Sequence, residues 1–431
     1  MFEYWTTLVS EEKKVSFSIQ CSPDDLPHYI YELLTSFGMT INHETGEILI
    51  PSLLTNTLEL RTKIYAYVDK YKDKSPRINK LRTFIQDLKD NTYFYMLPNK
   101  SELSQKDHFM VLGELTSHIK GIENQDAFEK IMKDTFSTLF DKYTIEGASS
   151  ERKVKVGEGL KSNRVCRFCD NTRAEKTTFK QEAHAISESL GNKTVILNEE
   201  CDACNKYFSE TIERDIDTYL KVFTTFFKVK NKENKVSTIK GKNFEFKPAY
   251  EGSEVDFVIV RYPDDEDGPS TGILDSIPLK FNEKVCYQNI YKALVKYALS
   301  VIDRKHISKF KNTIDWISDN NFKEKLPKVA LLETYQTFTR QPQLSVYIRH
   351  DDDNSLPMAI GEFKFTYMTY VFIIPTFSSD EPDFSDSKNY ERFWAFFKHY
   401  HSRNDWKYSD FSNPISDHFV LNMNFSQRGN N

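Results

Sequence analysis

The sequence predicts an α+β fold that is divided into several domains. The chain has 431 residues, whereas one domain commonly has about 100–200. Apolar residues recur at helical spacing through much of the first 150 residues, and strand and helix patterns are mixed after residue 248. Two pairs of cysteines lie between these regions. We therefore expect an α-rich N-terminal domain (residues 1–150), a central module (151–247) and an α+β C-terminal domain (248–431).

The expected elements of the two outer domains follow from their patterns. The first domain should contain a strand at 14–21, a hairpin at 39–50, and helices at 24–37, 53–71, 78–88, 103–119 and 127–143. The last should contain strands at 255–261, 344–349, 359–365 and 367–374, and helices at 289–302, 310–317 and 389–400. No motif in the first domain indicates a chemical role.

The composition is that of a folded protein. Hydrophobic residues make up 39% and aromatic residues 14%, which is ample for a buried core. The 58 Lys and Arg against 63 Asp and Glu give a net charge of −5, which excludes a basic coat over the whole surface. No apolar run approaches the roughly 20 residues that a bilayer requires, and the first residues lack the pattern of a signal peptide. We expect a cytoplasmic protein without membrane contact.

The cysteine pairs have the spacing of a metal site. They are Cys166-Arg-Phe-Cys169 and Cys201-Asp-Ala-Cys204, with 31 residues between them. A two-residue spacer lets both thiolates of a pair bind one ion, and two such pairs complete a tetrahedral zinc site. In a reducing compartment this pattern indicates metal binding rather than disulfides. The sequence therefore predicts a structural Zn²⁺ ion.

The segment between and after the pairs has the pattern of strand, loop, strand and helix. A strand at 177–185 would place Glu182 and His184 on one face, because side chains on a face repeat every second residue. A turn at 190–192 and a strand at 193–198 follow, and Cys201 opens a helix that carries Asn205. Zinc at both ends would bring His184 and Asn205 toward each other. Glu213, further along this helix, is expected at the surface.

Residues 160–220 resemble the HNH endonucleases, specifically the ββα-metal nucleases whose fold is braced by a treble-clef-like zinc. The resemblance rests on Cys-x-x-Cys, then Glu-Ala-His-Ala-Ile-Ser-x-x-Leu-Gly-Asn, then Asn-x-Glu-Cys-x-x-Cys-Asn-x-x-Phe, and it covers about a seventh of the chain. It implies a central ββα-metal module between the two outer domains.

The resemblance also implies roles for individual residues. His184 matches the general base that activates water, and Asn205 matches the ligand of a catalytic divalent ion. Asn198 is the better match, and Asn192 the weaker one, for the asparagine that holds the histidine in place.

One position departs from the family pattern. The family usually has Asp, Glu or His immediately before the base as a second metal ligand, but here that residue is Ala183, so we expect Glu182 to substitute.

These residue types suit phosphodiester hydrolysis. A histidine with a pKa near its ordinary value of about 6.5 can take a proton from water at neutral pH. A hard ion such as Mg²⁺ or Mn²⁺ prefers oxygen ligands, which Glu182 and the side-chain carbonyl of Asn205 offer, and it stabilises charge at the phosphate. Such an ion would act separately from the structural zinc.

Positive charge is concentrated around the cysteine module. Residues 151–180 hold nine Lys or Arg against four acids, and residues 221–247 hold eight Lys against two Glu. Such runs bind phosphates electrostatically, so the net charge of −5 is an average over unlike parts. We expect DNA as the substrate, with RNA as the other candidate.

Three hypotheses remain open at the level of sequence. The first is a metal-dependent endonuclease that hydrolyses DNA. The second is a non-catalytic zinc module that binds nucleic acid or a protein partner, with His184 in a structural role. The third, compatible with the first, makes the flanking domains a regulatory or sensor platform for an activating ligand or partner protein. The resemblance places such an effector in a prokaryotic defence or mobile-element system.

Overall fold

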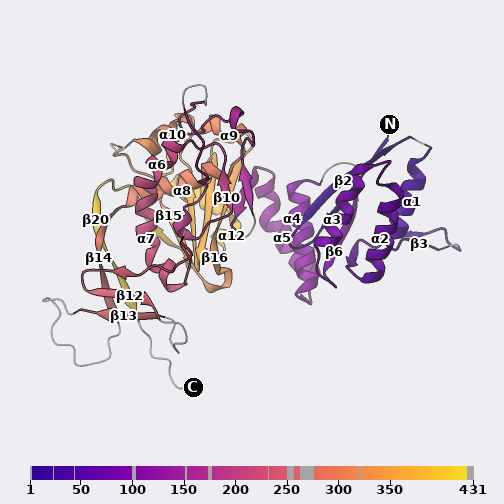
Figure 1. The fold of residues 1–431 in the computed structure, drawn as a ribbon, viewed down its shortest axis with the longest axis horizontal. Coiled ribbons are helices and arrows are strands. Elements are labelled where there is room, and N and C mark those ends of the chain that lie inside the picture. The colour runs from indigo at the N-terminus through magenta and orange to yellow at the C-terminus, as the bar shows by residue number, and fades with distance from the viewer. Residues whose placement is uncertain are drawn as a thin grey trace, which may run out of the picture. The chain divides into compact units, whose positions relative to one another are not determined.

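A computed structural model describes residues 2–22, 24–42, 44–99, 103–150, 153–172, 177–231, 233–249, 257–262, 276–319 and 322–424. The chain forms two compact units, Met1–Asp141 and Lys142–Asn431 (Figure 1). Both units combine helices with β-sheets, so the predicted α+β class is confirmed. No helix within these described ranges is long and apolar enough to cross a membrane.

The first unit is built on a four-stranded sheet with helices on both faces. Its strand order is β2-β1-β6-β5. Leu8 packs into the core of helices α1 to α3, whereas the next residue, Val9, packs with Leu115 of α4. The elements are β1 (Phe2–Val9), β2 (Lys14–Cys21), α1 (Leu26–Ser36), β3 (Thr40–Ile41), β4 (Ile48–Leu49), β5 (Leu53–Thr55), α2 (Leu58–Tyr71), α3 (Asn79–Asp87), β6 (Tyr93–Asn99), α4 (Gln105–Ile119) and α5 (Gln125–Phe140).

Three strands of this sheet were not expected: β1 and β6 lie outside every expected element, and β5 occupies the start of the helix that was expected at 53–71, which begins only at Leu58. Both β1 and β6 are central strands, and four consecutive residues of β1, from Thr6 to Val9, are fully buried. A strand that is buried on both faces loses the alternation of polar and apolar residues that identifies a strand in a sequence. The expectation of an α-rich domain therefore omitted its central sheet.

The second unit is built on a six-stranded antiparallel sheet. Its strand order is β19-β15-β18-β17-β16-β7. The strands are β7 (Tyr143–Ser149), β15 (Val329–Glu333), β16 (Thr339–Arg349), β17 (Ala359–Thr366), β18 (Met368–Ile373) and β19 (Lys407–Ser409). Strand β7 precedes the cysteine module in the chain, and β15 to β19 follow it. The sheet therefore combines strands from before and after the module. The functional division expected at residue 247 stays a prediction.

Helices cover both faces of this sheet. The nearly fully buried helix α8 (Tyr287–Val301) packs on one face, where Tyr291 Oη donates a hydrogen bond to the Ile373 carbonyl at 2.7 Å. Helices α11 (Ser387–Phe396) and α12 (Lys398–His401) pack on the other face, where the Tyr400 hydroxyl donates to Glu362. Smaller elements complete the unit: β11 (Ile239–Lys240), β12 (Phe244–Pro248), β13 (Phe257–Arg261), β14 (Ser276–Cys286), α9 (Arg304–Ile307), α10 (Lys311–Ser318) and β20 (Ser416–Asn424).

Candidate active site and zinc site

The cysteine module is a three-stranded sheet followed by two helices. Strand β10 (Val195–Leu197) pairs in parallel with β8 (Val154–Val156) and antiparallel with β9 (Ala183–His184). Helix α6 (Asp202–Glu210) follows β10, and α7 (Ile212–Phe226) continues from it. The predicted order of strand, loop, strand and helix is therefore present, with β8 as an additional strand.

The first cysteine pair lies on a short hairpin and the second at the start of a helix. The amide of Cys166 donates to the Asn171 carbonyl at 2.9 Å, and this turn lies inside the isolated bridge between Val165 and Thr172. Cys201 is the N-cap of α6, where its Sγ accepts from the Cys204 amide at 3.4 Å. A hairpin and a helix start therefore present the two pairs to each other.

The sulfur positions fit a zinc ion. The four Sγ atoms of Cys166, Cys169, Cys201 and Cys204 all lie within 4.8 Å of one another, and none of these residues forms a disulfide. Zinc–sulfur bonds of about 2.3 Å in a tetrahedron place sulfurs about 3.8 Å apart, and the Cys169 and Cys201 sulfurs are 3.8 Å apart. The clustered cysteines thus indicate the predicted structural zinc site.

The strand that carries His184 is much shorter than the sequence predicts. Instead of 177–185, only Ala183 and His184 form a strand, and they pair with Leu197 and Ile196. The preceding segment bends around the start of α6, because the Asp202 carboxylate accepts from the amides of residues 180 and 181 at 3.1 and 2.9 Å. These two amides therefore donate to a side chain at the start of α6 instead of pairing with a neighbouring strand.

A cavity of about 540 Å³ brings together three of the predicted residues, Glu182, His184 and Asn205. The His184 side chain is 21% exposed, and its Nδ1 lies 3.9 Å from Oε2 of Glu188, another lining residue. The other lining residues are Gln181, Ser187, Ser189, Ser209, Glu213, Asn231 and Ser237. The cavity therefore contains an imidazole ring and several side-chain oxygen atoms of the kind that bind metal ions.

The two expected metal ligands remain accessible in this cavity. Glu182 is 65% exposed, and its nearest described cation is Lys155, whose Nζ lies 3.8 Å from the carboxylate. Asn205 donates through Nδ2 to Gln181 at 3.5 Å, which leaves its amide oxygen for another partner. Ala183, at the position where a ligand is usual in HNH nucleases, is 2% exposed and cannot serve. Oxygen ligands of this kind suit Mg²⁺, which commonly keeps several waters and takes one or two carboxylates.

The two candidate asparagines have different surroundings. Asn198 accepts from Arg164 at 3.0 Å and is not among the residues that line the cavity. Asn192 is fully buried, and its Nδ2 donates to the carbonyls of Ile186 and Val195 at 2.8 and 3.1 Å. Ile186 follows His184 in the chain, and Val195 precedes Ile196, the strand partner of His184. Asn192 therefore ties together the two ends of the loop that connects β9 to β10.

The turn before Asn192 requires glycine. Gly191 has a φ of +90°, and a Cβ at this position would lie 2.7 Å from a methyl group of Val229. Both the backbone conformation and the close approach therefore exclude a larger side chain.

Glu213 lines the cavity, and the sequence analysis misplaced it. It is 7% exposed rather than at the surface, and its carboxylate lies 2.8 Å from Lys296 Nζ of helix α8. Glu200 lies 3.0 Å from the same ammonium group. Burial alone would lower the pKa of Lys296, but the charges of the two carboxylates raise it overall. Burial raises the pKa of Glu200 to about 7. We call these three residues the Lys296 cluster.

A buried arginine, Arg167, joins the zinc hairpin to the end of α8 and forms a second buried ion pair within the module. Arg167, between the first two cysteines, lies 2.7 Å from Glu199 and donates to the carbonyls of Leu299 and Ile302 at 2.6 and 3.1 Å. Both members of the pair are almost fully buried. The module is therefore anchored to α8 at two points, and each point includes one carboxylate from the segment just before Cys201, Glu199 at one and Glu200 at the other.

Comparison with known proteins agrees with this geometry. A zinc-braced ββα fold with a histidine on its first strand defines a class of metal-dependent nuclease domains. Residues 166–220 match the family model described as HNH endonuclease, so this part of the chain is an HNH endonuclease domain. No curated protein matches the chain, and no solved structure matches it. The resemblance identified from the sequence is confirmed.

Proposed function

We propose that this protein is a metal-dependent endonuclease that hydrolyses phosphodiester bonds in DNA, with His184 as the general base. The observation that carries the proposal is the shared cavity of His184, Glu182 and Asn205 beside the cysteine cluster. The match to the HNH endonuclease family supports nuclease activity and hence a nucleic-acid substrate.

His184 has the setting that a general base needs. Its ring is partly exposed to the cavity, so it can accept a proton from a water molecule that attacks phosphorus. Glu188, 3.9 Å from Nδ1, can orient the ring and stabilise the positive charge that proton transfer leaves on it. We assign Glu188 a positioning role of this kind.

A divalent ion would be held by Glu182 and Asn205. Mg²⁺ or Mn²⁺ bound there would stabilise the charge that develops on the phosphate oxygens. The cysteine cluster has a different role, because its four thiolates complete a closed site. We assign the task of holding the His184 loop to Asn192 in preference to Asn198, on the evidence of their hydrogen bonds.

Plasmid cleavage tests the proposal. The purified protein with Mg²⁺ or Mn²⁺ should cut plasmid DNA, and His184→Ala should abolish the cutting while the protein keeps its zinc. The alternative, a non-catalytic zinc module that binds nucleic acid or a protein partner, predicts equal behaviour of the two proteins. Equal cutting by both, or cutting by neither across metals and substrates, would remove the support for a catalytic His184.

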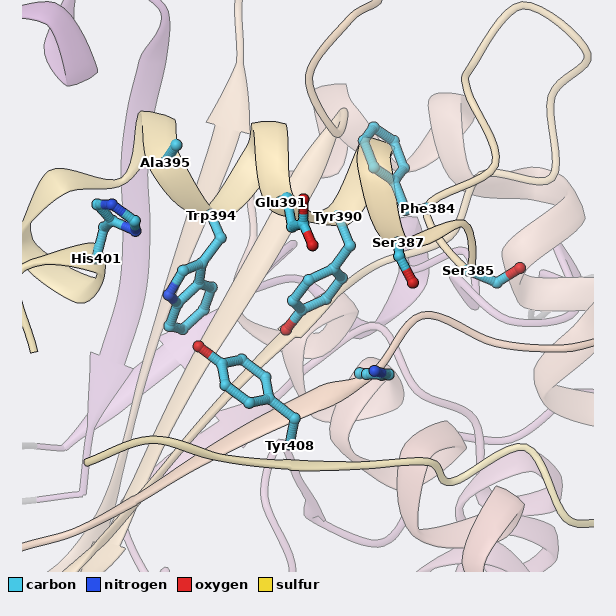
Figure 2. A pocket seen from close by; sticks show the side chains of 10 residues that line it. Phe384, Ser385, Ser387, Tyr390, Glu391, Trp394, Ala395, His401 and Tyr408 are labelled. Atoms are coloured by element: carbon cyan, nitrogen blue, oxygen red, sulfur yellow. The ribbon is translucent and has the colours of Figure 1, made fainter. Parts of the chain in front are cut away.

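We also propose a regulatory role for residues 248–431. The observation that favours it is a hollow of about 500 Å³ between α11 and β19, lined by Tyr390, Trp394, Tyr408 and Lys328. Figure 2 shows Tyr390 and Trp394 side by side, with the ring of Tyr408 facing them. Aromatic walls suit a planar small molecule, and the lining carries charges of both signs, on Lys328 and Glu391. A thermal-shift screen of such molecules, repeated with Tyr408→Ala, tests this role.

The biological setting rests on the resemblance alone. A place in a prokaryotic defence or mobile-element system stays a prediction, and it requires that nuclease activity depend on a trigger. Comparison of cleavage with and without a molecule found in the thermal-shift screen would test that dependence.

A further inference from the structure

Three aromatic rings form a nearly parallel stack on the surface of the second unit. The ring of Tyr335 lies 5.2 Å from that of Tyr367 with an interplanar angle of 15°, and 6.5 Å from that of Phe338 with an angle of 18°. Phe227 packs against all three rings at 5.1–6.4 Å. Tyr335 is nevertheless 67% exposed and Phe338 39% exposed. We call these four residues the aromatic stack.

The aromatic stack adjoins the HNH cavity through one short segment. Phe227 is the C-cap of α7, and two residues later Val229 packs against the turn at Gly191, behind His184. Asn231, two residues further, lines the cavity itself. On the other side, the carbonyl of Arg340 lies 4.0 Å from the Cβ position of Gly191. The stack and the cavity are therefore built on the same turn.

Cations surround this segment. Lys228, Lys230 and Lys235 are exposed on the chain that leads from the stack past the cavity, and Arg340 is exposed beyond Phe338. Of the acids nearby, Glu333 pairs with Lys407, and Glu233 pairs at 3.7 Å with one of these lysines, Lys235.

Exposed aromatic rings beside cations suit a single nucleic-acid strand. Unpaired bases stack on the rings while the cations contact the phosphates. A fully paired duplex offers phosphates but no free base faces, so the rings would contribute nothing to its binding. The charge of the surface favours nucleic acid over a protein partner.

We propose that the aromatic stack binds unpaired bases of the DNA strand that is cut in the HNH cavity. This inference rests on the proposed nuclease function and narrows its substrate to DNA with a single-stranded or unpaired segment beside the scissile bond. Tyr335 is the main contact, because it is the most exposed ring of the stack. Lys228, Lys230 and Arg340 contact phosphates on either side.

Binding to a fluorescent single-stranded oligonucleotide and to a blunt duplex tests the inference. The measurements use the full chain carrying His184→Ala, so that no DNA is cut. Tyr335→Ala should weaken single-strand binding roughly 5- to 150-fold, since stacking of one base contributes about 1–3 kcal/mol, and should change duplex binding less than twofold. Tyr335→Trp should restore single-strand binding. Tyr31→Ala, which removes a 51% exposed ring in the first unit, is the matched control.

The outcomes separate this inference from the nuclease proposal. Unchanged single-strand binding by Tyr335→Ala, or an equal loss for both substrates, overturns the role of the stack even if the wild-type protein cuts DNA. If Tyr335→Ala weakens single-strand binding but not duplex binding, the result supports the role of the aromatic stack even if no cleavage is found. Failure of Tyr335→Trp to restore binding also counts against stacking, because tryptophan offers a larger ring face.

Discussion

Replacement of Lys296 by methionine should strongly destabilise the second unit. The Lys296 ammonium lies 2.8 Å from Glu213 and 3.0 Å from Glu200, and the Lys296 and Glu200 side chains are completely buried. Methionine preserves most of the aliphatic stem but removes the ammonium group, which lies 5.9 and 5.7 Å from the ring centres of Phe168 and Phe208. It therefore leaves two buried carboxylates without a cation. Removal of one partner of a buried ion pair costs about 3–5 kcal/mol, a large share of the 5–15 kcal/mol that stabilises a typical domain.

The loss of stability caused by Lys296→Met should depend on pH. In the wild-type protein, burial raises the pKa of Glu200 from 4.5 to about 7. The folded state therefore binds more protons than the unfolded state between these values, and this group makes folding less favourable as the pH rises through them. Removal of the Lys296 charge raises the pKa of Glu200 further. The destabilisation by Lys296→Met should therefore be larger at pH 8 than at pH 5.

Urea denaturation followed by circular dichroism at both pH values measures this effect. Lys305→Met, which removes a 65% exposed lysine of the same unit, is the control and should change stability little. A triple variant that also carries Glu200→Gln and Glu213→Gln should recover part of the loss, because no unpaired charge remains buried. If Lys296→Met is as stable as the wild-type protein at pH 8, the reasoning from a buried charge cluster is refuted.

Three further predictions concern the HNH domain. Cys204→Ser should lower bound zinc from about one ion per chain, measured by elemental analysis, whereas Cys286→Ser, at a buried cysteine outside the cluster, should not. Asn192→Ala should lower the free energy of unfolding, measured by urea denaturation, by about 1–3 kcal/mol more than Asn198→Ala does, because it leaves buried carbonyls and amides without partners. Glu182→Gln should raise the Mg²⁺ concentration needed for plasmid cleavage without changing the zinc content; an unchanged requirement would contradict its role as a ligand.

The zinc site could be predicted from the sequence because its determinants are local. The two-residue spacer between Cys166 and Cys169 nearly fixes how both sulfurs can face one ion, and the same holds for Cys201 and Cys204. The helix that begins at Cys201 then places Asn205 one turn further on. The structure accordingly places His184 and Asn205 on one cavity.

The surroundings of the site depend on residues far away in the chain. Glu213 meets Lys296, which is 83 residues away, and Arg167 meets the carbonyl of Leu299, which is 132 residues away. The residues near Glu213 in the sequence do not distinguish it from a surface carboxylate on an amphipathic helix. The shortening of the His184 strand has a similar origin, because Asp202 lies about 20 residues after the amides that it binds. Long-range partners of this kind leave no periodic pattern in a single sequence.

The two buried ion clusters bear on how the proposed nuclease activity could be regulated. Glu213 belongs both to the lining of the HNH cavity and to the Lys296 cluster on α8. Arg167 ties the zinc hairpin to the far end of the same helix. Detachment of the module would separate Lys296 from both carboxylates and expose the apolar core that the module shares with α8, at a cost that small ligands rarely supply. We therefore expect any control of the proposed nuclease activity to act while the module stays on α8, through access to the cavity or through a shift of α8 that moves Glu213.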